Sequence, residues 1–168
     1  MKKTVMAVVL LVSTGVAVAA KVGAPAPDFT GTSSAAQDIS LAQYQGKYVV
    51  LQWHNKDCPY VRAHYDSGHM QKLQQEWTAK GIIWLTIISS AAGKQGHVDA
   101  KGAEADVRAT GAAPTATILD PAGTIGRAYR AQTTPHMFVI DPQGTLIYDG
   151  AIDNRATTSR YQQKSANE

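Results

Sequence analysis

Two runs of β-branched and aromatic residues limit what this chain can fold into. Residues 47–53 (KYVVLQW) indicate a buried strand, and residues 82–88 (IIWLTII) indicate a second strand that is apolar on both faces. Between them, Met70, Leu73 and Trp77 recur at helical spacing. A strand, a helix and a second buried strand in this order predict parallel pairing, and therefore an α/β domain.

The rest of the chain continues the alternation of strands and helices. We expect further elements in this order: a helix over 98–110, a strand over 115–119, a helical turn over 125–130, and strands over 136–140 and 145–148. Between the last two strands, Asp141-Pro142-Gln143-Gly144 is a turn sequence placed to make an antiparallel hairpin. The expected fold is therefore a central sheet of mixed pairing flanked by helices.

The N-terminal residues resemble an export signal more than a structural element. Lys2 and Lys3 form a basic region, residues 5–12 are apolar, and residues 17–20 (AVAA) offer the small side chains that signal peptidase requires. We expect residues 1–20 to be a signal peptide, cleaved after Ala19 or Ala20, and the protein to be exported, to a bacterial periplasm. The alternative is a membrane anchor, but the apolar stretch is short for about 30 Å of hydrocarbon, so stable membrane insertion is not expected.

Composition narrows the classes of function. The formal charge of the 168-residue chain is +3, with 16 basic and 13 acidic residues, and removing Lys2 and Lys3 leaves +1. A nearly neutral chain gives no electrostatic reason to bind nucleic acid. We expect one domain over residues 21–153, followed by a polar tail over residues 154–168.

The only cysteine, Cys58, follows the first strand and precedes the first helix. An exported protein meets an oxidising compartment, and a lone cysteine there is a buried apolar residue, a site of intermolecular pairing or a reactive thiol. Pro59 suits the first turn of a helix, which places Cys58 at the N-cap or first turn of a long helix. The helix N-terminus stabilises a thiolate; Lys56 would add to this effect and Asp57 would oppose it.

Four segments carry a resemblance to a known family. They are residues 23–29 (GAPAPDF), residues 41–47 (LAQYQGK), Cys58-Pro59, and residues 133–141 (TTPHMFVID). In this order, and with these strands around them, the chain from 22 to 153 resembles the thioredoxin-like superfamily, on the redoxin branch of alkyl hydroperoxide reductase and thiol-specific antioxidant proteins. The resemblance implies a thioredoxin-like fold with a redoxin-type N-terminal extension and a βα insertion.

The resemblance also implies a site and its chemistry. Cys58 would be the catalytic thiol, and a cis bond before Pro135 would open the backbone of Thr134 to an extended substrate beside it. Two departures matter. Val61 stands where a second, resolving cysteine would be, and Asn55 stands where peroxidases of the superfamily carry threonine or serine. An intermediate formed on Cys58 cannot then be resolved within the chain.

Other residues near Cys58 would shape the site: Trp53 and Tyr60 as walls of a pocket, and His136 as a neighbour across the sheet. Packing explains both aromatic residues equally well. His136 is a candidate base for Cys58, or the second member of a two-ligand metal site, although one thiol and one imidazole are incomplete for zinc or copper. His54 is a further candidate for tuning the thiol. We therefore predict neither a metal nor a cofactor.

Three functions are consistent with these residues. The first is an exported thiol oxidoreductase that acts on a protein thiol or disulfide, or on a small peroxide, and is recycled by an external thiol. The second is a non-catalytic module that docks a partner protein at the groove between Cys58 and Pro135. The third is metal handling by Cys58 and His136.

Overall fold

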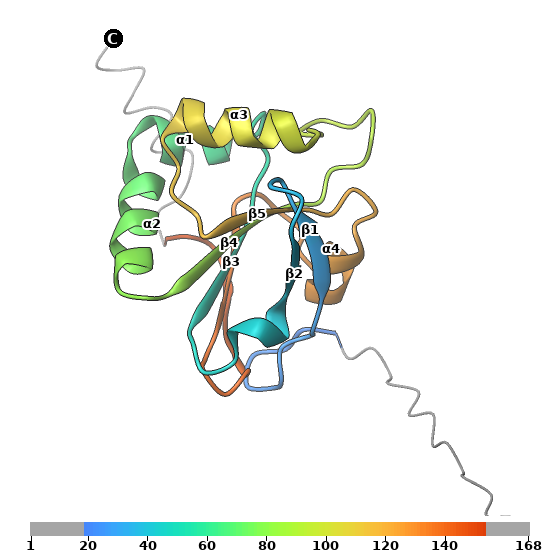
Figure 1. Ribbon diagram of the computed structural model, residues 1–168, viewed down its shortest axis with the longest axis vertical. Coiled ribbons are helices and arrows are strands. Elements are labelled where there is room, and N and C mark those ends of the chain that lie inside the picture. Colours follow the sequence, from blue (N-terminus) through green and yellow to red (C-terminus); the bar gives the residue numbers. More distant parts are fainter. Residues whose placement is uncertain (1–18, 154–168) are drawn as a thin grey trace, which may run out of the picture.

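β3 (Val49–Trp53) and β4 (Ile83–Ile88) form the parallel centre of a mixed sheet, as the two apolar runs predicted. The computed structural model describes residues 19–153, and in this part of the chain the sheet has seven strands in the order β2-β1-β5-β4-β3-β6-β7 (Figure 1). The other strands are β1 (Thr30–Ser33), β2 (Asp38–Ser40), β5 (Ala116–Leu119), β6 (His136–Ile140) and β7 (Leu146–Gly150). β5 is parallel to β4, whereas β6 is antiparallel to β3 and forms the predicted hairpin with β7.

Helices cover both faces of the sheet. They are α1 (Pro59–Asp66), α2 (His69–Ala79), α3 (Ala100–Thr110), α4 (Thr124–Tyr129) and a 3-10 turn, η1 (Leu41–Tyr44). α2 and α4 lie on opposite sides of the sheet (Figure 1). The β1–β2 hairpin with η1 is the expected N-terminal extension, and α3, β5 and α4 intervene between β4 and β6 as the expected βα insertion.

Side chains of β3 alternate between two apolar clusters, one on each face of the sheet. Leu51 and Trp53 point to the α4 side, where they pack with Phe138 and Tyr129. Val50 points to the α1 and α2 side, into the cluster of Val61, Tyr65, Met70, Trp84 and Met137. Because both faces of β3 are buried, its position in the sheet is fixed from both sides.

A buried polar network ties α1 and α2 to the sheet. The Gln52 amide donates to the Tyr65 hydroxyl at 2.9 Å, and the Gln52 carbonyl oxygen accepts from Trp84 Nε1 at 2.8 Å and from Gln74 Nε2 at 3.1 Å. The Gln74 carbonyl oxygen in turn accepts the Ala113 amide. Both glutamines are fully buried. Such buried polar groups tolerate only arrangements in which they stay hydrogen-bonded, so the network specifies how the two helices sit on the sheet.

The long helix expected after Cys58 is two helices, and that prediction was wrong. α1 ends at Asp66 and α2 begins at His69, with Gly68 between them in the left-handed region at φ +72°. The spacing of Met70 and Leu73 predicts one helix because apolar periodicity does not register a single left-handed residue. The break allows α2 to change direction and to place Gln74 in the buried network.

The resemblance implied an N-terminal extension, but the two strands of its β1–β2 hairpin were not predicted from the sequence. The strands have four and three residues, Thr-Gly-Thr-Ser and Asp-Ile-Ser, and Ile39 is the one large apolar side chain between them, which is too little to mark a strand. Gly31 explains the close packing of β1, because a Cβ at this position would lie 2.6 Å from Cγ2 of Ile118 in β5 and 3.1 Å from Cδ1 of Ile125 in α4. A glycine here lets the added hairpin approach the core.

Two of the predicted segments fall largely or wholly outside residues 19–153. The signal peptide was predicted over residues 1–20 and the polar tail over residues 154–168. Among the described helices, none has the length and apolar character needed to cross a membrane.

Burial of two tyrosines predicts a pH dependence of stability. Burial raises the pKa of Tyr65 to about 12, although hydrogen bonds from Gln52 and Gln74 oppose the shift, and burial also raises the pKa of Tyr129. The folded protein therefore holds these protons more tightly than the unfolded chain, so their contribution to stability is complete below about pH 10 and is lost as pH rises further. We expect two of the seven tyrosines to ionise only with loss of the circular dichroism of the fold. Ultraviolet titration showing all of them ionised in folded protein would contradict this.

Candidate active site around Cys58

Cys58 is the N-cap residue of α1, as the sequence predicted. Its backbone is extended, at φ −77° and ψ 121°, and Pro59 occupies the first helical position. The Cys58 amide donates to the Asn55 carbonyl at 3.0 Å, and the Cys58 carbonyl accepts the first helical bond, from the Arg62 amide at 3.0 Å. The side chain is partly exposed. The thiol thus lies at the positive end of a helix and within reach of solvent.

The sulfur touches a segment that is far away in the sequence. Cys58 Sγ lies 3.2 Å from the carbonyl oxygen of Thr134, with the thiol as donor. The Thr134–Pro135 bond is cis, as the resemblance implied. Trp53 at the end of β3 pairs with His136 at the start of β6, and this register brings the two connecting segments together. A backbone acceptor therefore points at the sulfur from the facing side of the site.

Asn55 and Asp57 build the turn that leads to Cys58. The Asn55 side-chain oxygen accepts the Asp57 amide at 2.9 Å. Lys56 Nζ lies 2.7 Å from the Asp57 carboxylate. That hydrogen bond, with a smaller contribution from the Gly96 amide, lowers the pKa of Asp57 below its usual value. The ammonium group of Lys56 is therefore paired with Asp57, and its expected effect on the thiol stays a prediction.

Trp53 belongs to the core. Its indole is buried among Tyr129 and Phe138, and its N–H donates to Ser89 Oγ at 3.1 Å. Together with Asn55 and Thr134 it does line a polar cavity of about 270 Å³ beside the thiol segment. Trp53 is therefore both a packed core residue and part of a cavity wall, the two roles that the sequence left open.

The imidazole of His136 is hydrogen-bonded to residues other than Cys58. Its Nε2 lies 2.7 Å from the Asp149 carboxylate in β7, and its Nδ1 accepts the Gln132 amide at 3.3 Å. Both ring nitrogens are thus engaged at the β6–β7 edge, and the suggested Cys58–His136 pair is not formed. His54 is likewise paired elsewhere, with Asp106 at 2.9 Å. No group of three or more His, Cys, Asp and Glu side chains in residues 19–153 is placed to hold a metal ion.

The positions that flank Cys58 on α1 differ in environment. Tyr60 is 46% exposed, so it borders the site without enclosing it. Val61, at the position of a resolving cysteine in dithiol relatives, is buried in the apolar cluster with Tyr65 and Met70. An apolar side chain therefore fills that position, and the site has one thiol.

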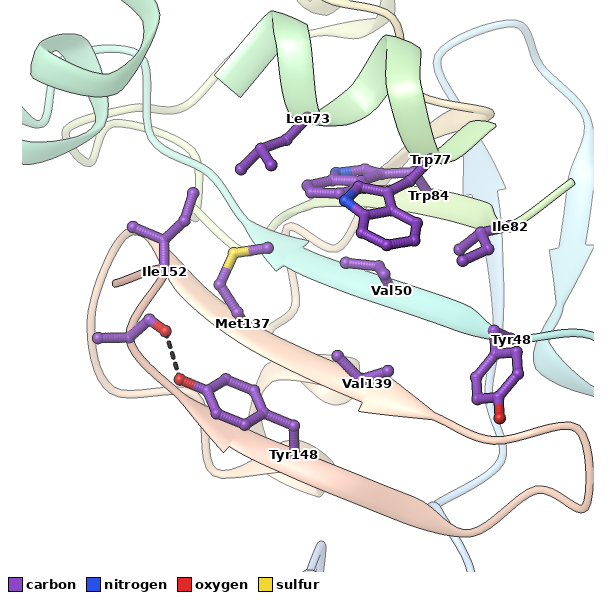
Figure 2. A pocket seen from close by; sticks show the side chains of 11 residues that line it. Tyr48, Val50, Leu73, Trp77, Ile82, Trp84, Met137, Val139, Tyr148 and Ile152 are labelled. Atoms are coloured by element: carbon purple, nitrogen blue, oxygen red, sulfur yellow. Dashed lines mark hydrogen bonds between the residues drawn. The ribbon is translucent and has the colours of Figure 1, made fainter. Parts of the chain in front are cut away.

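The described surface also carries an apolar groove that the sequence did not predict. Its volume is about 620 Å³, and Figure 2 shows it between α2 and the β6–β7 hairpin. Exposed Trp77 and Tyr148 form its walls, and Trp84 and Met137 part of its floor. A bulge in the β6–β7 pairing places Tyr148 on this face, opposite Val139. The helical spacing of Trp77 predicts an apolar helix face, but nothing in the sequence distinguishes a covered face from an open one.

The fold is thioredoxin-like, with one cysteine at a helix N-terminus beside a cis-proline segment. Residues 22–149 match the AhpC/TSA family, and the chain belongs to that family. Over 45 residues it is 49% identical to peroxiredoxin-2 of Rattus norvegicus, a match that covers 25% of this chain. That match spans only 23% of the length of the relative.

Solved structures share the fold. A thiol:disulfide interchange protein of the DsbE type from Chlorobium tepidum has a TM-score of 0.65 at 22% identity, covering 87% of this chain and 96% of its own. A secreted Mycobacterium tuberculosis disulfide oxidoreductase homologous to DsbE of E. coli has a TM-score of 0.59 at 17% identity, covering 82% and 95%. An uncharacterized conserved protein from Geobacillus kaustophilus has a TM-score of 0.72 at 20% identity, covering 80% and 71%. At these identities the likeness shows the fold alone.

The geometry of His136 predicts how its loss affects the thiol. Because its nitrogens serve Asp149 and Gln132, we expect His136→Gln to change the alkylation rate of Cys58 by less than about threefold, whereas loss of a general base typically costs about a hundredfold or more. Asp149→Asn is the matched variant, since it weakens the same pair and keeps the imidazole. A hundredfold slower reaction in folded His136→Gln protein, with Asp149→Asn unaffected, would show that the imidazole does act on the thiol.

Proposed function

We propose that this chain is an exported thiol oxidoreductase that acts through Cys58 alone and is recycled by an external thiol. One observation carries the proposal: the Cys58 sulfur lies at the N-terminus of α1 and 3.2 Å from the Thr134 carbonyl. The helix end favours an anionic sulfur, whereas the Thr134 carbonyl accepts the thiol proton and favours the neutral thiol in the free protein. The same carbonyl offers an extended substrate a hydrogen-bonding partner. Membership of the AhpC/TSA family supports the same chemistry.

The proposed reaction has two exchange steps. The Cys58 thiolate attacks one sulfur of a substrate disulfide, which forms a mixed disulfide and releases the other substrate sulfur as a thiolate. An external thiolate then attacks one of the two sulfurs of the mixed disulfide. Attack on the substrate sulfur releases the Cys58 thiolate and leaves the substrate disulfide-bonded to the reductant. Attack on the Cys58 sulfur releases the substrate thiol and leaves Cys58 disulfide-bonded to the reductant. A further external thiol completes the cycle, so two electrons pass from external thiols to the substrate. An external thiol is required because Val61, at the position of a resolving cysteine, has no sulfur to attack the mixed disulfide.

Protein disulfides suit this site better than small peroxides. Asn55 replaces the hydroxyl residue of peroxidase relatives, and its side-chain oxygen is occupied by the Asp57 amide. The Thr134 carbonyl, in contrast, is a backbone acceptor of the kind that an extended polypeptide uses. If a peroxide is the oxidant, the thiolate attacks one peroxide oxygen, the second leaves as an alcohol or water, and Cys58 becomes a sulfenic acid that external thiols reduce.

Export to the periplasm is part of the proposal. It is supported by the basic, apolar and small-residue pattern of residues 1–20 and by the secreted relative of the same fold. An oxidising compartment would supply the protein disulfides that the proposed reaction consumes.

The direct test is to mix the purified reduced protein with a disulfide-containing peptide and to follow its intact mass. We expect a mixed disulfide on Cys58 that persists until a thiol such as glutathione is added, because the chain has no second cysteine. Cys58→Ser is the control and should form no adduct. A native protein that forms no adduct with the peptide disulfide and no sulfenic acid with hydrogen peroxide, while denatured protein does, would favour the non-catalytic binding module.

Restoring the second thiol should restore internal resolution. Val61 is buried and close to Cys58 on α1, so we expect Val61→Cys to increase insulin-disulfide reduction with dithiothreitol severalfold over the wild type. Val61→Ser is the matched control, since it has the same shape as cysteine without the sulfur. Equal turnover in folded Val61→Cys and Val61→Ser would mean that more than the missing thiol separates this site from a dithiol enzyme.

A further inference from the structure

The loop between β4 and α3 touches the Cys58 turn at one buried point. Residues 91–95 of this loop are exposed, but Gly96 is buried. A buried glycine in an exposed loop indicates a contact that holds the loop against another segment. The segment that it meets is the turn from Asn55 to Cys58.

Two hydrogen bonds join the loop to the turn, and both end on Asp57. The Gly96 amide donates to the Asp57 carboxylate at 3.1 Å, and the Gln95 side-chain amide donates to the Asp57 carbonyl at 3.1 Å. Asp57 and Cys58 are both hydrogen-bonded to Asn55. The backbone amide of Asp57 donates to the Asn55 side-chain oxygen, and the backbone amide of Cys58 donates to the Asn55 backbone carbonyl. A continuous chain of hydrogen bonds therefore runs from the loop to the thiol residue.

Gly96 is the residue on which this contact depends. It has a φ of +78°, and a Cβ here would lie 2.3 Å from the Asn55 side-chain oxygen. Any other residue would push Asn55 away and open the turn. Gly93, in the same loop, has a nearly identical φ of +75°, but nothing lies within 4 Å of where its Cβ would be. The two glycines share a backbone conformation and differ in their contact with the site.

We propose that Gly96 and Asp57 are positioning residues for Cys58, and that the β4–α3 loop holds the thiol at the N-terminus of α1. This inference rests on the proposed function and extends it to residues outside the thiol's own helix. The turn is otherwise exposed at Lys56 and Asp57, so few other contacts hold it in place. Because the effect of a helix end falls off within its first turn, a small displacement of Cys58 is enough to weaken it.

Asp57 contributes a charge as well as a hydrogen bond, and the two have opposite effects on the stability of the Cys58 thiolate. Its carboxylate lies beside Lys56 and within electrostatic range of Arg62, and its lowered pKa keeps it ionised. A negative charge next to Cys58 disfavours a thiolate, whereas the clamp to Gly96 keeps the sulfur where the helix favours one. Variants that separate charge from hydrogen bond therefore separate the two effects.

The first test compares Gly96→Ala with Gly93→Ala by the pH profile of Cys58 alkylation with iodoacetamide. We expect Gly96→Ala to react about two- to fivefold more slowly than the wild type at pH 7, with its profile moved to higher pH, because the thiol leaves the helix end. Gly93→Ala imposes the same backbone strain and should follow the wild type. Equal profiles for the two variants would overturn the inference.

The second test compares Asp57→Asn with Asp57→Ala, because both remove the charge and only asparagine keeps an acceptor for Gly96. We expect Asp57→Asn to react about threefold faster than the wild type, and Asp57→Ala about two- to fivefold more slowly than Asp57→Asn. Equal rates for these two variants would also overturn the inference, and this pair decides it if Gly96→Ala does not fold. A wild-type Cys58 no more reactive than glutathione would instead contradict the proposed function itself.

Discussion

The antiparallel pairing of β3 with β6 is the constraint on which the site depends. In this register Trp53 lies opposite His136, so the segment after β3 and the segment before β6 leave the sheet at the same edge. Cys58 and Thr134 are 76 positions apart, yet the pairing brings the sulfur to 3.2 Å from the carbonyl. A slip of one residue would turn every side chain of β3 to the other face and would separate the two groups. Burial of β3 in both apolar clusters prevents that slip.

The helix that carries Cys58 depends on the rest of the fold for its stability. α1 has eight residues, and a helix of that length is marginal in water by itself. Val61 and Tyr65 anchor it to the sheet, the first by apolar packing and the second through the hydrogen bonds of Gln52 and Gln74. The buried network therefore places the N-terminus of α1, and with it the thiol, at a fixed point above the end of β3.

The sequence predicted the parts of the molecule that follow from local pattern. The two apolar runs predicted β3 and β4, and Pro59 after Cys58 predicted the helix start. The break at Gly68 escaped prediction, because it depends on one left-handed residue that apolar spacing does not register. The contact of Gly96 with Asn55 escaped as well, since it joins two polar segments that only the folded sheet brings together. Interactions between distant polar segments leave no periodic trace in a sequence.

The shared Cys58–Thr134 site is tested most directly by the crystal structure of Cys58 in a mixed disulfide with a cysteine-containing peptide. We expect an extended peptide beside residues 133–135, with a peptide N–H donating to the Thr134 carbonyl in place of the Cys58 thiol. We also expect Cys58 to keep its place at the N-terminus of α1. A peptide that leaves the sulfur without any backbone contact to Thr134 would contradict the claim that Cys58 and Thr134 form one substrate site.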